Sequence, residues 1–127
     1  MRKIYLLLLI ILNSCSSISQ NCNEIHVGNF ELNSTVSGKT KIHRTEKLQI
    51  ETNEFMKVKS QYDINWVDDC TYQLKNRKLL SGNEEYNGEP NDIFTVKILK
   101  IEGSKIFVRT SANFTDSVFE SQIDIVK

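Results

Sequence analysis

The sequence predicts an all-β protein, a single antiparallel up-and-down meander of about eight strands that closes into a small barrel. Apolar and polar residues alternate in short runs along residues 25–127, and polar or glycine-containing breaks separate the runs. No segment of this part shows the apolar period of a long helix. Closure into a barrel would pair the two edge strands, which otherwise expose backbone groups. A two-sheet β-sandwich is the alternative architecture.

The N-terminus predicts export. Residues 1–14 combine a basic tip, an apolar run at residues 6–12 that is too short to span a bilayer, and small polar residues, which is typical of a signal peptide. Residues 12–15 read Leu-Asn-Ser-Cys and resemble the lipobox of bacterial lipoproteins, in which the cysteine becomes the lipidated first residue. Cys15 is then the lipidation site, and residues 15–24 form a lipid anchor and tether. Ordinary cleavage after residue 19 is the alternative.

The charge of the mature chain argues against a nucleic-acid partner. Of the 16 basic residues, Arg2 and Lys3 lie in the signal peptide, which leaves 14 against 16 acidic residues and a net charge of −2. Such a chain has no basic surplus with which to neutralise phosphates. We expect a monomer held at the membrane of the cell envelope by a lipid on Cys15. After the alternative cleavage it would be a soluble periplasmic or secreted protein.

Two cysteines are left for the folded part under either cleavage. An exported chain oxidises such a pair, so we expect a disulfide between Cys22 and Cys70. The loop of about 48 residues that it closes corresponds to a stabilisation of about 4 kcal/mol in the chain-entropy relation. His26 and His43 are scattered and lack the close ligand pairs of a structural zinc site, so we expect no metal.

The first half of the folded part predicts a strand followed by a hairpin. Residues 26–32 form the first strand, and residues 39–44 and 48–52 form the hairpin. Arg44 ends its strand on the apolar side, either as a rim charge that reaches a ligand or as a guanidinium that extends into solvent. The expected opposite pairs are Ile42 with Ile50 and Arg44 with Leu48.

The central hairpin is the strongest local pattern. Residues 57–66 and 70–75 alternate in period two, and they contain the only tryptophan, Trp66. Opposite residues must face the same side, so we expect a three-residue loop at residues 67–69 and burial of Trp66 beside it. The expected opposite pairs are Trp66 with Cys70, Ile64 with Tyr72 and Tyr62 with Leu74.

The C-terminal part predicts three more strands. Residues 76–92 are turn-rich and hold the only proline, so we expect a loop there. Residues 93–102 form the most apolar strand, with a bulge near Leu99 where the alternation breaks. Residues 105–111 follow, and after a loop at residues 113–117 the last strand turns Phe119 inward.

Two resemblances extend this interpretation. The step Gly28-Asn-Phe30 resembles the Gly-x-Trp step with which lipocalins close one end of their barrel. Over the whole mature length the chain resembles a family of short exported proteins of Bacteroidetes, some of which carry a name borrowed from a DNA topoisomerase subunit. The resemblance implies an extracytoplasmic β protein without an established activity, and export, length and charge argue against topoisomerase chemistry. The segments that carry it are Gln20-Asn-Cys22, Gly28-Asn-Phe30, Ile42-His-Arg44, Gln49-Ile-Glu51, Ile64-Asn-Trp66 and Asp69-Cys-Thr-Tyr72.

No set of residues predicts catalysis or a cofactor. A nucleophile needs a base and an orienting group, and no such set stands out, so we expect a protein that is not an enzyme. An interaction or structural module of the envelope is the first hypothesis, because aromatic side chains would largely fill so narrow a barrel. The alternative is a lipocalin-like binder of a small hydrophobic ligand, which needs a cavity of at least about 300 Å³. Its candidate ligand-binding residues at the barrel mouth are Arg44, Tyr62, Trp66 and Tyr72.

Overall fold

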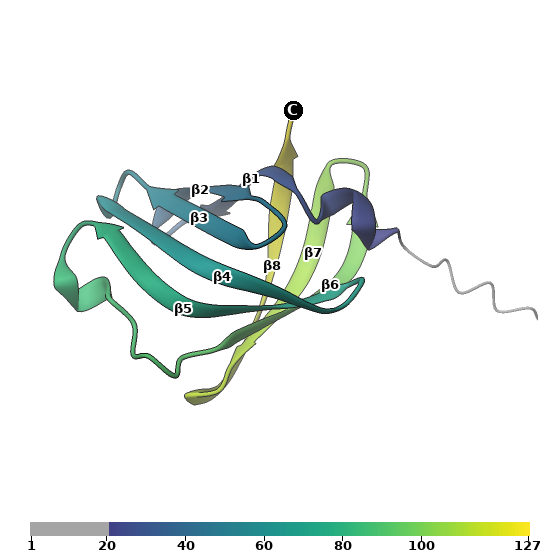
Figure 1. Cartoon of the computed structure of the whole chain (residues 1–127). Coiled ribbons are helices and arrows are strands. Elements are labelled where there is room, and N and C mark those ends of the chain that lie inside the picture. Colours follow the sequence, from purple (N-terminus) through teal and green to yellow (C-terminus); the bar gives the residue numbers. More distant parts are fainter. Residues whose placement is uncertain (1–20) are drawn as a thin grey trace, which may run out of the picture.

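A computed structural model describes residues 21–127, so the predicted signal peptide and Cys15 lie outside the described residues. Eight antiparallel strands form a closed barrel in the order of the sequence, which confirms the predicted meander and excludes the sandwich (Figure 1). None of the helical elements in residues 21–127 is long and apolar enough to cross a membrane. The elements are η1 (Cys22–Ile25), β1 (Gly28–Ser34), β2 (Gly38–Arg44), β3 (Leu48–Asn53), β4 (Val58–Asp68), β5 (Thr71–Ser81), η2 (Glu84–Tyr86), β6 (Phe94–Glu102), β7 (Lys105–Ala112) and β8 (Thr115–Val126).

The core lies inside the barrel and follows the alternation of the sequence. In β4, for example, Val58, Tyr62 and Ile64 are buried, whereas Lys59 and Asp63, which occupy alternate positions of the strand, are exposed. Burial of each large apolar side chain contributes roughly 1.5–3 kcal/mol, so this lining stabilises the closed sheet. The apolar core of the barrel consists of Phe30, Ile42, Tyr62, Ile64, Tyr72, Leu74, Val96, Ile98, Ile106, Val108 and Ile123.

The two ends of the barrel differ. At the end where β1 begins and β2 ends, η1 lies across the strands, and Cys22 and Ile25 are buried there (Figure 1). We call this the plugged end. The opposite end, called the open end here, carries the connections at residues 35–37, 54–57, 82–93 and 113–114.

The register of the β4–β5 hairpin differs from the expected one. Trp66 pairs with Tyr72 and Asp68 pairs with Thr71, so the turn has two residues, Asp69 and Cys70. A register shift at Val67 inserts one extra residue, which returns both apolar sets to the inner face despite the short turn. Cys70 therefore lies in the turn, not opposite Trp66 inside the barrel. The expected pairs Ile64 with Tyr72 and Tyr62 with Leu74 are wrong by the same shift.

The β2–β3 hairpin is shifted by one residue. Ile42 pairs with Glu51 and Arg44 pairs with Gln49, so the expected pairs with Ile50 and Leu48 are wrong. The turn is closed by the Thr45 N–H, which donates to the Leu48 carbonyl oxygen at 2.9 Å. This register turns the polar residues of β3 inward. The reason is the burial of Arg44, which needs hydrogen-bond acceptors inside the barrel.

Three further expectations fall on the C-terminal half. The bulge near Leu99 is confirmed by a register shift between Ile98 and Lys100. The loop expected from residue 76 starts later, because β5 continues to Ser81 after a left-handed residue at Asn76 (φ 52°). Phe119 lies on the inner side of β8 but is 65% exposed, because this part of the strand extends past the end of the core.

Strand pairing is incomplete toward the open end. β5 pairs with β6 only through residues 71–74. Likewise, residues 29–32 of β1 pair with residues 123–126 of β8, and the pairing of these two strands ends there. Among the strands of residues 21–127, β7 is therefore the only partner of residues 115–122 of β8. The β7–β8 hairpin projects beyond the neighbouring strands, as its tip in Figure 1 shows.

Candidate functional site

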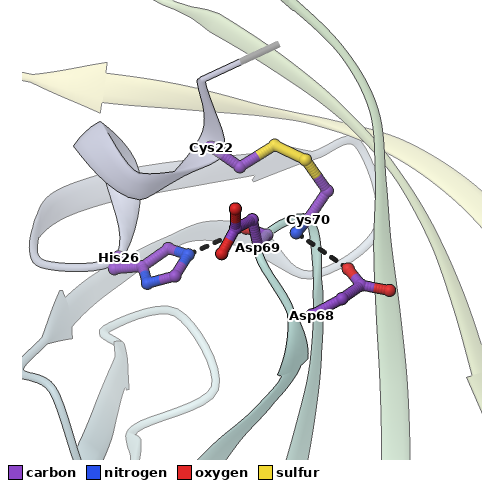
Figure 2. The surroundings of a disulfide bond; sticks show 5 residues. All are labelled: Cys22, His26, Asp68, Asp69 and Cys70. Carbon is purple, nitrogen blue, oxygen red and sulfur yellow. Dashed lines mark hydrogen bonds between the residues drawn. A yellow bond between two sulfur atoms is a disulfide. The ribbon is translucent and has the colours of Figure 1, made fainter. Parts of the chain in front are cut away.

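The plugged end is fixed by a disulfide, which Figure 2 shows, and by an aromatic stack. Cys22 and Cys70 form the expected bond, with their Cα atoms 5.3 Å apart. The His26 ring stacks on Trp66 with 3.5 Å between centroids, and its Nε2 lies 2.8 Å from the Asp69 carbonyl oxygen. Because a carbonyl oxygen only accepts, this nitrogen carries the proton. These contacts join the chain's entry to the β4–β5 turn.

Arg44 is buried directly beneath this plug. Its side chain is 2% exposed, which corrects both expected readings of a rim charge and of a guanidinium extended into solvent. Its three donor nitrogens are all used: Nε donates to Gln49 Oε1 at 2.9 Å, one terminal nitrogen to the Ile25 carbonyl at 3.0 Å, and the other to the Tyr72 hydroxyl at 2.9 Å. The guanidinium also lies 4.6 Å from the centroid of the Phe30 ring. Satisfied donors and aromatic faces make this burial possible without a directly paired acid.

A polar chain continues from Arg44 into the barrel. Gln49 accepts from Arg44 and donates from Nε2 to Glu51 Oε1 at 3.0 Å. Burial raises the pKa of the Glu51 carboxyl, although Gln49, Arg77, Arg44 and Tyr62 all favour its charged form. Burial, assisted by the Glu51 charge, also raises the pKa of the Tyr62 hydroxyl. The interior thus holds a carboxyl that keeps its proton to a higher pH than an ordinary glutamate does.

Replacing Glu51 with glutamine should stabilise the protein progressively more as the pH rises. The folded protein keeps the Glu51 proton to higher pH than the unfolded chain, because its pKa is raised from 4.5. The stability that this group contributes is therefore complete below pH 4.5 and is lost as the pH rises through the raised pKa. Glutamine does not titrate and avoids this loss. Urea melts at about pH 4 and about pH 7 measure the difference, with exposed Glu46→Gln as the control. A larger destabilisation by Glu51→Gln at the higher pH would contradict it.

The interior retains a small cavity beside this polar chain. It measures about 180 Å³, below the roughly 300 Å³ at which ligand pockets for drug-sized molecules begin. The aromatic residues thus do not fill the barrel completely, but the space that they leave is smaller than an ordinary ligand pocket. Arg77 lies near the cavity, with its guanidinium 5.8 Å from the Tyr62 ring centroid. The lining residues are Leu32, Ile42, Gln49, Glu51, Tyr62, Tyr72, Leu74, Phe94, Val96, Val108, Thr110, Ser121 and Ile123.

Apolar side chains gather at the open end. Phe94 and Phe114 meet edge to face with 5.5 Å between centroids. Together with Phe119 they line an apolar hollow of about 90 Å³ on the β7–β8 hairpin. Of the nine exposed large apolar side chains in residues 21–127, six lie at the open end, whereas Val27, Val67 and Val126 lie toward the plugged end. These six, which we call the apolar rim, are Val36, Phe55, Leu80, Phe114, Val118 and Phe119.

The structure brings together three of the four predicted ligand-binding residues, but not at a mouth. Arg44, Trp66 and Tyr72 form one cluster beneath the plug, where Trp66 is half-buried rather than fully buried. Tyr62 lies deeper in the barrel, near Glu51. Sequence reasoning missed Gln49, Glu51 and Arg77, because the wrong β2–β3 register placed the first two outside. The only available signal was the burial requirement of Arg44 itself.

A larger hollow of about 510 Å³ lies on the outer face of β1 to β4. Its basic side chains, Lys41 and Lys59, are exposed and do not converge on a buried group. Within residues 21–127, no group of three or more His, Cys, Asp or Glu side chains is arranged to hold a metal ion. Comparisons with models of protein families, with curated proteins and with solved structures gave no match.

Proposed function

We propose that this protein is a non-enzymatic lipoprotein of the cell envelope whose small β-barrel is an interaction module that contacts another protein through its open end. The apolar rim is the observation that carries this proposal. Apolar side chains that gather on one part of a surface mark interaction sites far more often than scattered ones do. The small size of the interior cavity also favours a module over a container.

The predicted lipid anchor is compatible with a partner at the open end. Six residues separate Cys15 from Cys22, so a lipid on Cys15 would lie at most about 25 Å along the chain from the plugged end. The plugged end would then face the membrane that holds the lipid. The apolar rim would face away from it, toward other components of the envelope.

The anchor itself is tested by metabolic labelling. Cells grown with a fatty-acid probe should label the protein, and Cys15→Ser should remove the label. A mature protein that begins at Gln20 and carries no lipid would contradict the anchor. This result would not bear on the interaction module. The next experiment tests the module directly.

Photo-crosslinking in intact cells tests the open end. A photoreactive residue placed at Phe55 or at Phe114 should yield the same protein adduct. Val67 is the matched control, because it is exposed and apolar but lies next to the β4–β5 turn at the plugged end. Adducts from Val67 but not from the rim positions, or no adduct from any position, would contradict the proposal.

A lipocalin-like binder of a small hydrophobic ligand is the second candidate, favoured by the apolar hollow at the open end. The interior cavity of about 180 Å³ restricts such a ligand to a molecule smaller than a drug-sized one. Native mass spectrometry of protein purified from its own cells would then show a bound small molecule. Leu74→Trp, which fills the cavity, should displace it, whereas Val126→Trp on the outside should not.

A further inference from the structure

The interior cavity has a polar wall and an apolar wall. The polar wall is formed by the neighbouring strands β3, β4 and β5, through Gln49, Glu51, Tyr62 and Tyr72. The other side chains that line the cavity are apolar, except for two hydroxyl-bearing residues of β7 and β8. A ligand that fits this space therefore has a polar group at one end and an apolar body.

The cavity extends to the place where the wall of the barrel separates. Leu32 of β1 and Ile123 of β8 are the last paired residues of these strands toward the open end, and both line the cavity. Ser121, the next inward-facing residue of β8, lines it as well and lies beyond this pairing. Entry from the open end therefore breaks no hydrogen bond between β1 and β8.

The charges at the polar wall are those of two cations and one acid. Arg44 is hydrogen-bonded to two residues of this wall, and Arg77 lies over the ring of a third, Tyr62. Both guanidiniums act electrostatically on the Glu51 carboxyl. The wall thus has one positive charge in excess when Glu51 is ionised. A ligand with a single negative charge compensates this excess, whereas a cation increases it.

The hydrogen-bonding groups at this wall also favour a ligand that accepts. Arg77 Nε is buried and has no hydrogen-bond partner among residues 21–127. A guanidinium only donates, so this nitrogen needs an acceptor. Burial raises the pKa of the Tyr62 and Tyr72 hydroxyls, so both keep their protons and can donate. A carboxylate supplies several acceptor positions in one small group.

Glu51 is compatible with such a ligand when it is protonated. Burial raises the pKa of its carboxyl, and a second carboxylate nearby raises that pKa further. The charged and titratable groups that face it are Arg44 on β2, Tyr62 on β4, and Tyr72 and Arg77 on β5. Binding then takes up a proton, and the neutral acid donates a short, strong hydrogen bond to the ligand.

We propose that the interior cavity binds a small monocarboxylate whose apolar body is about the size of a benzene ring. The carboxylate lies at the polar wall beside Tyr62, Tyr72 and Arg77, and the body lies on the apolar wall. An apolar protein cavity of about 150 Å³ accommodates benzene, so one of about 180 Å³ accommodates such a ring with one small substituent. This inference rests on the second candidate function, for which it names the ligand class, and it is independent of the contact at the open end.

NMR titration of the purified mature protein, with its disulfide intact, tests the charge of the ligand. Benzoate, benzyl alcohol and benzylamine carry a negative, a neutral and a positive group on the same ring at about pH 6. Benzoate should bind at least roughly tenfold more tightly than the other two. Absence of benzoate binding, or equal or tighter binding of either of the others, would overturn the inference.

The Arg77→Gln variant tests the cation at the polar wall. It should weaken benzoate binding roughly tenfold and leave the binding of benzyl alcohol unchanged. Arg109→Gln is the matched control, because Arg109 is exposed on the outside of β7, and it should change neither. An equal loss of both ligands in a folded Arg77→Gln protein would mean that Arg77 shapes the cavity without selecting a charge.

The Glu51→Gln variant decides the matter even if Arg77→Gln does not fold. In the unaltered protein, benzoate should bind more weakly as the pH rises from about 6 to about 8, because binding takes up a proton. The glutamine amide still donates but does not titrate, so the variant should bind benzoate without this pH dependence. Loss of benzoate binding in the variant would overturn the inference, because it would mean that the site needs a negative charge at Glu51.

The ligand class and the second candidate function can fail separately. A neutral or cationic molecule in native mass spectrometry would support the binder and reject the monocarboxylate. Benzoate binding by the purified protein, with no molecule bound in protein from its own cells, would support the site and reject the binder as the function in those cells.

Discussion

Replacing Arg44 with alanine should lower the free energy of unfolding by about 3–5 kcal/mol, the range of large truncations inside a protein. The guanidinium is 2% exposed and donates to Gln49, Tyr72 and the Ile25 carbonyl. Its removal leaves these buried acceptors without their partner, and each such group costs about 1–3 kcal/mol. It also opens a void beneath the aromatic rings. For a domain of this size, whose whole stability is about 5–15 kcal/mol, this is a large fraction.

Urea denaturation of the oxidised protein measures this effect, with Arg109→Ala as the matched control. Arg109 is an exposed arginine that forms an ion pair with Glu120 at 2.7 Å on the surface. Surface pairs contribute about 0–1 kcal/mol, so the control should change little. Similar losses in both variants would mean that Arg44 is not a structural centre of the plugged end.

The overall architecture could be predicted because it depends on a property that each strand shows by itself. A strand with one buried face alternates in period two, and β4, β6 and β7 do so almost without error. The Cys22–Cys70 bond followed from the number of cysteines and the expected export, without any geometry. Neither inference requires knowing which residues lie opposite each other.

Register could not be predicted, because local patterns do not reveal a buried polar group. In β3, Leu48 and Ile50 look like the inner set, but the chain turns Gln49 and Glu51 inward to satisfy Arg44. In the β4–β5 hairpin, one bulged residue at Val67 makes a two-residue turn compatible with the alternation. The incomplete pairing of β1 with β8 could not be predicted for the same reason, since it results from where β1 ends relative to β8.

Loss of the Cys22–Cys70 disulfide is expected to lower the free energy of unfolding by about 4 kcal/mol, from the chain-entropy relation for a separation of 48 residues. The variant Cys22→Ser with Cys70→Ser tests this in denaturant melts. The bond also holds η1 on the barrel, because Cys22 belongs to η1 and Cys70 to the β4–β5 turn. A loss well below 1 kcal/mol would mean that η1 stays in place through its other contacts alone.

The disulfide and Arg44 should be coupled, because both fix η1. Arg44 donates to the Ile25 carbonyl, which belongs to the segment that the disulfide holds. Without the disulfide this segment can detach, so Arg44→Ala should then cost less than it does in the oxidised protein. A double-mutant cycle should give a coupling of roughly 0.5–3 kcal/mol, the range for residues that share a partner. Sucrose in all four melts keeps the doubly altered protein folded enough to measure. Strict additivity would mean that Arg44 acts through Gln49 and Tyr72 alone and that the plug does not depend on it.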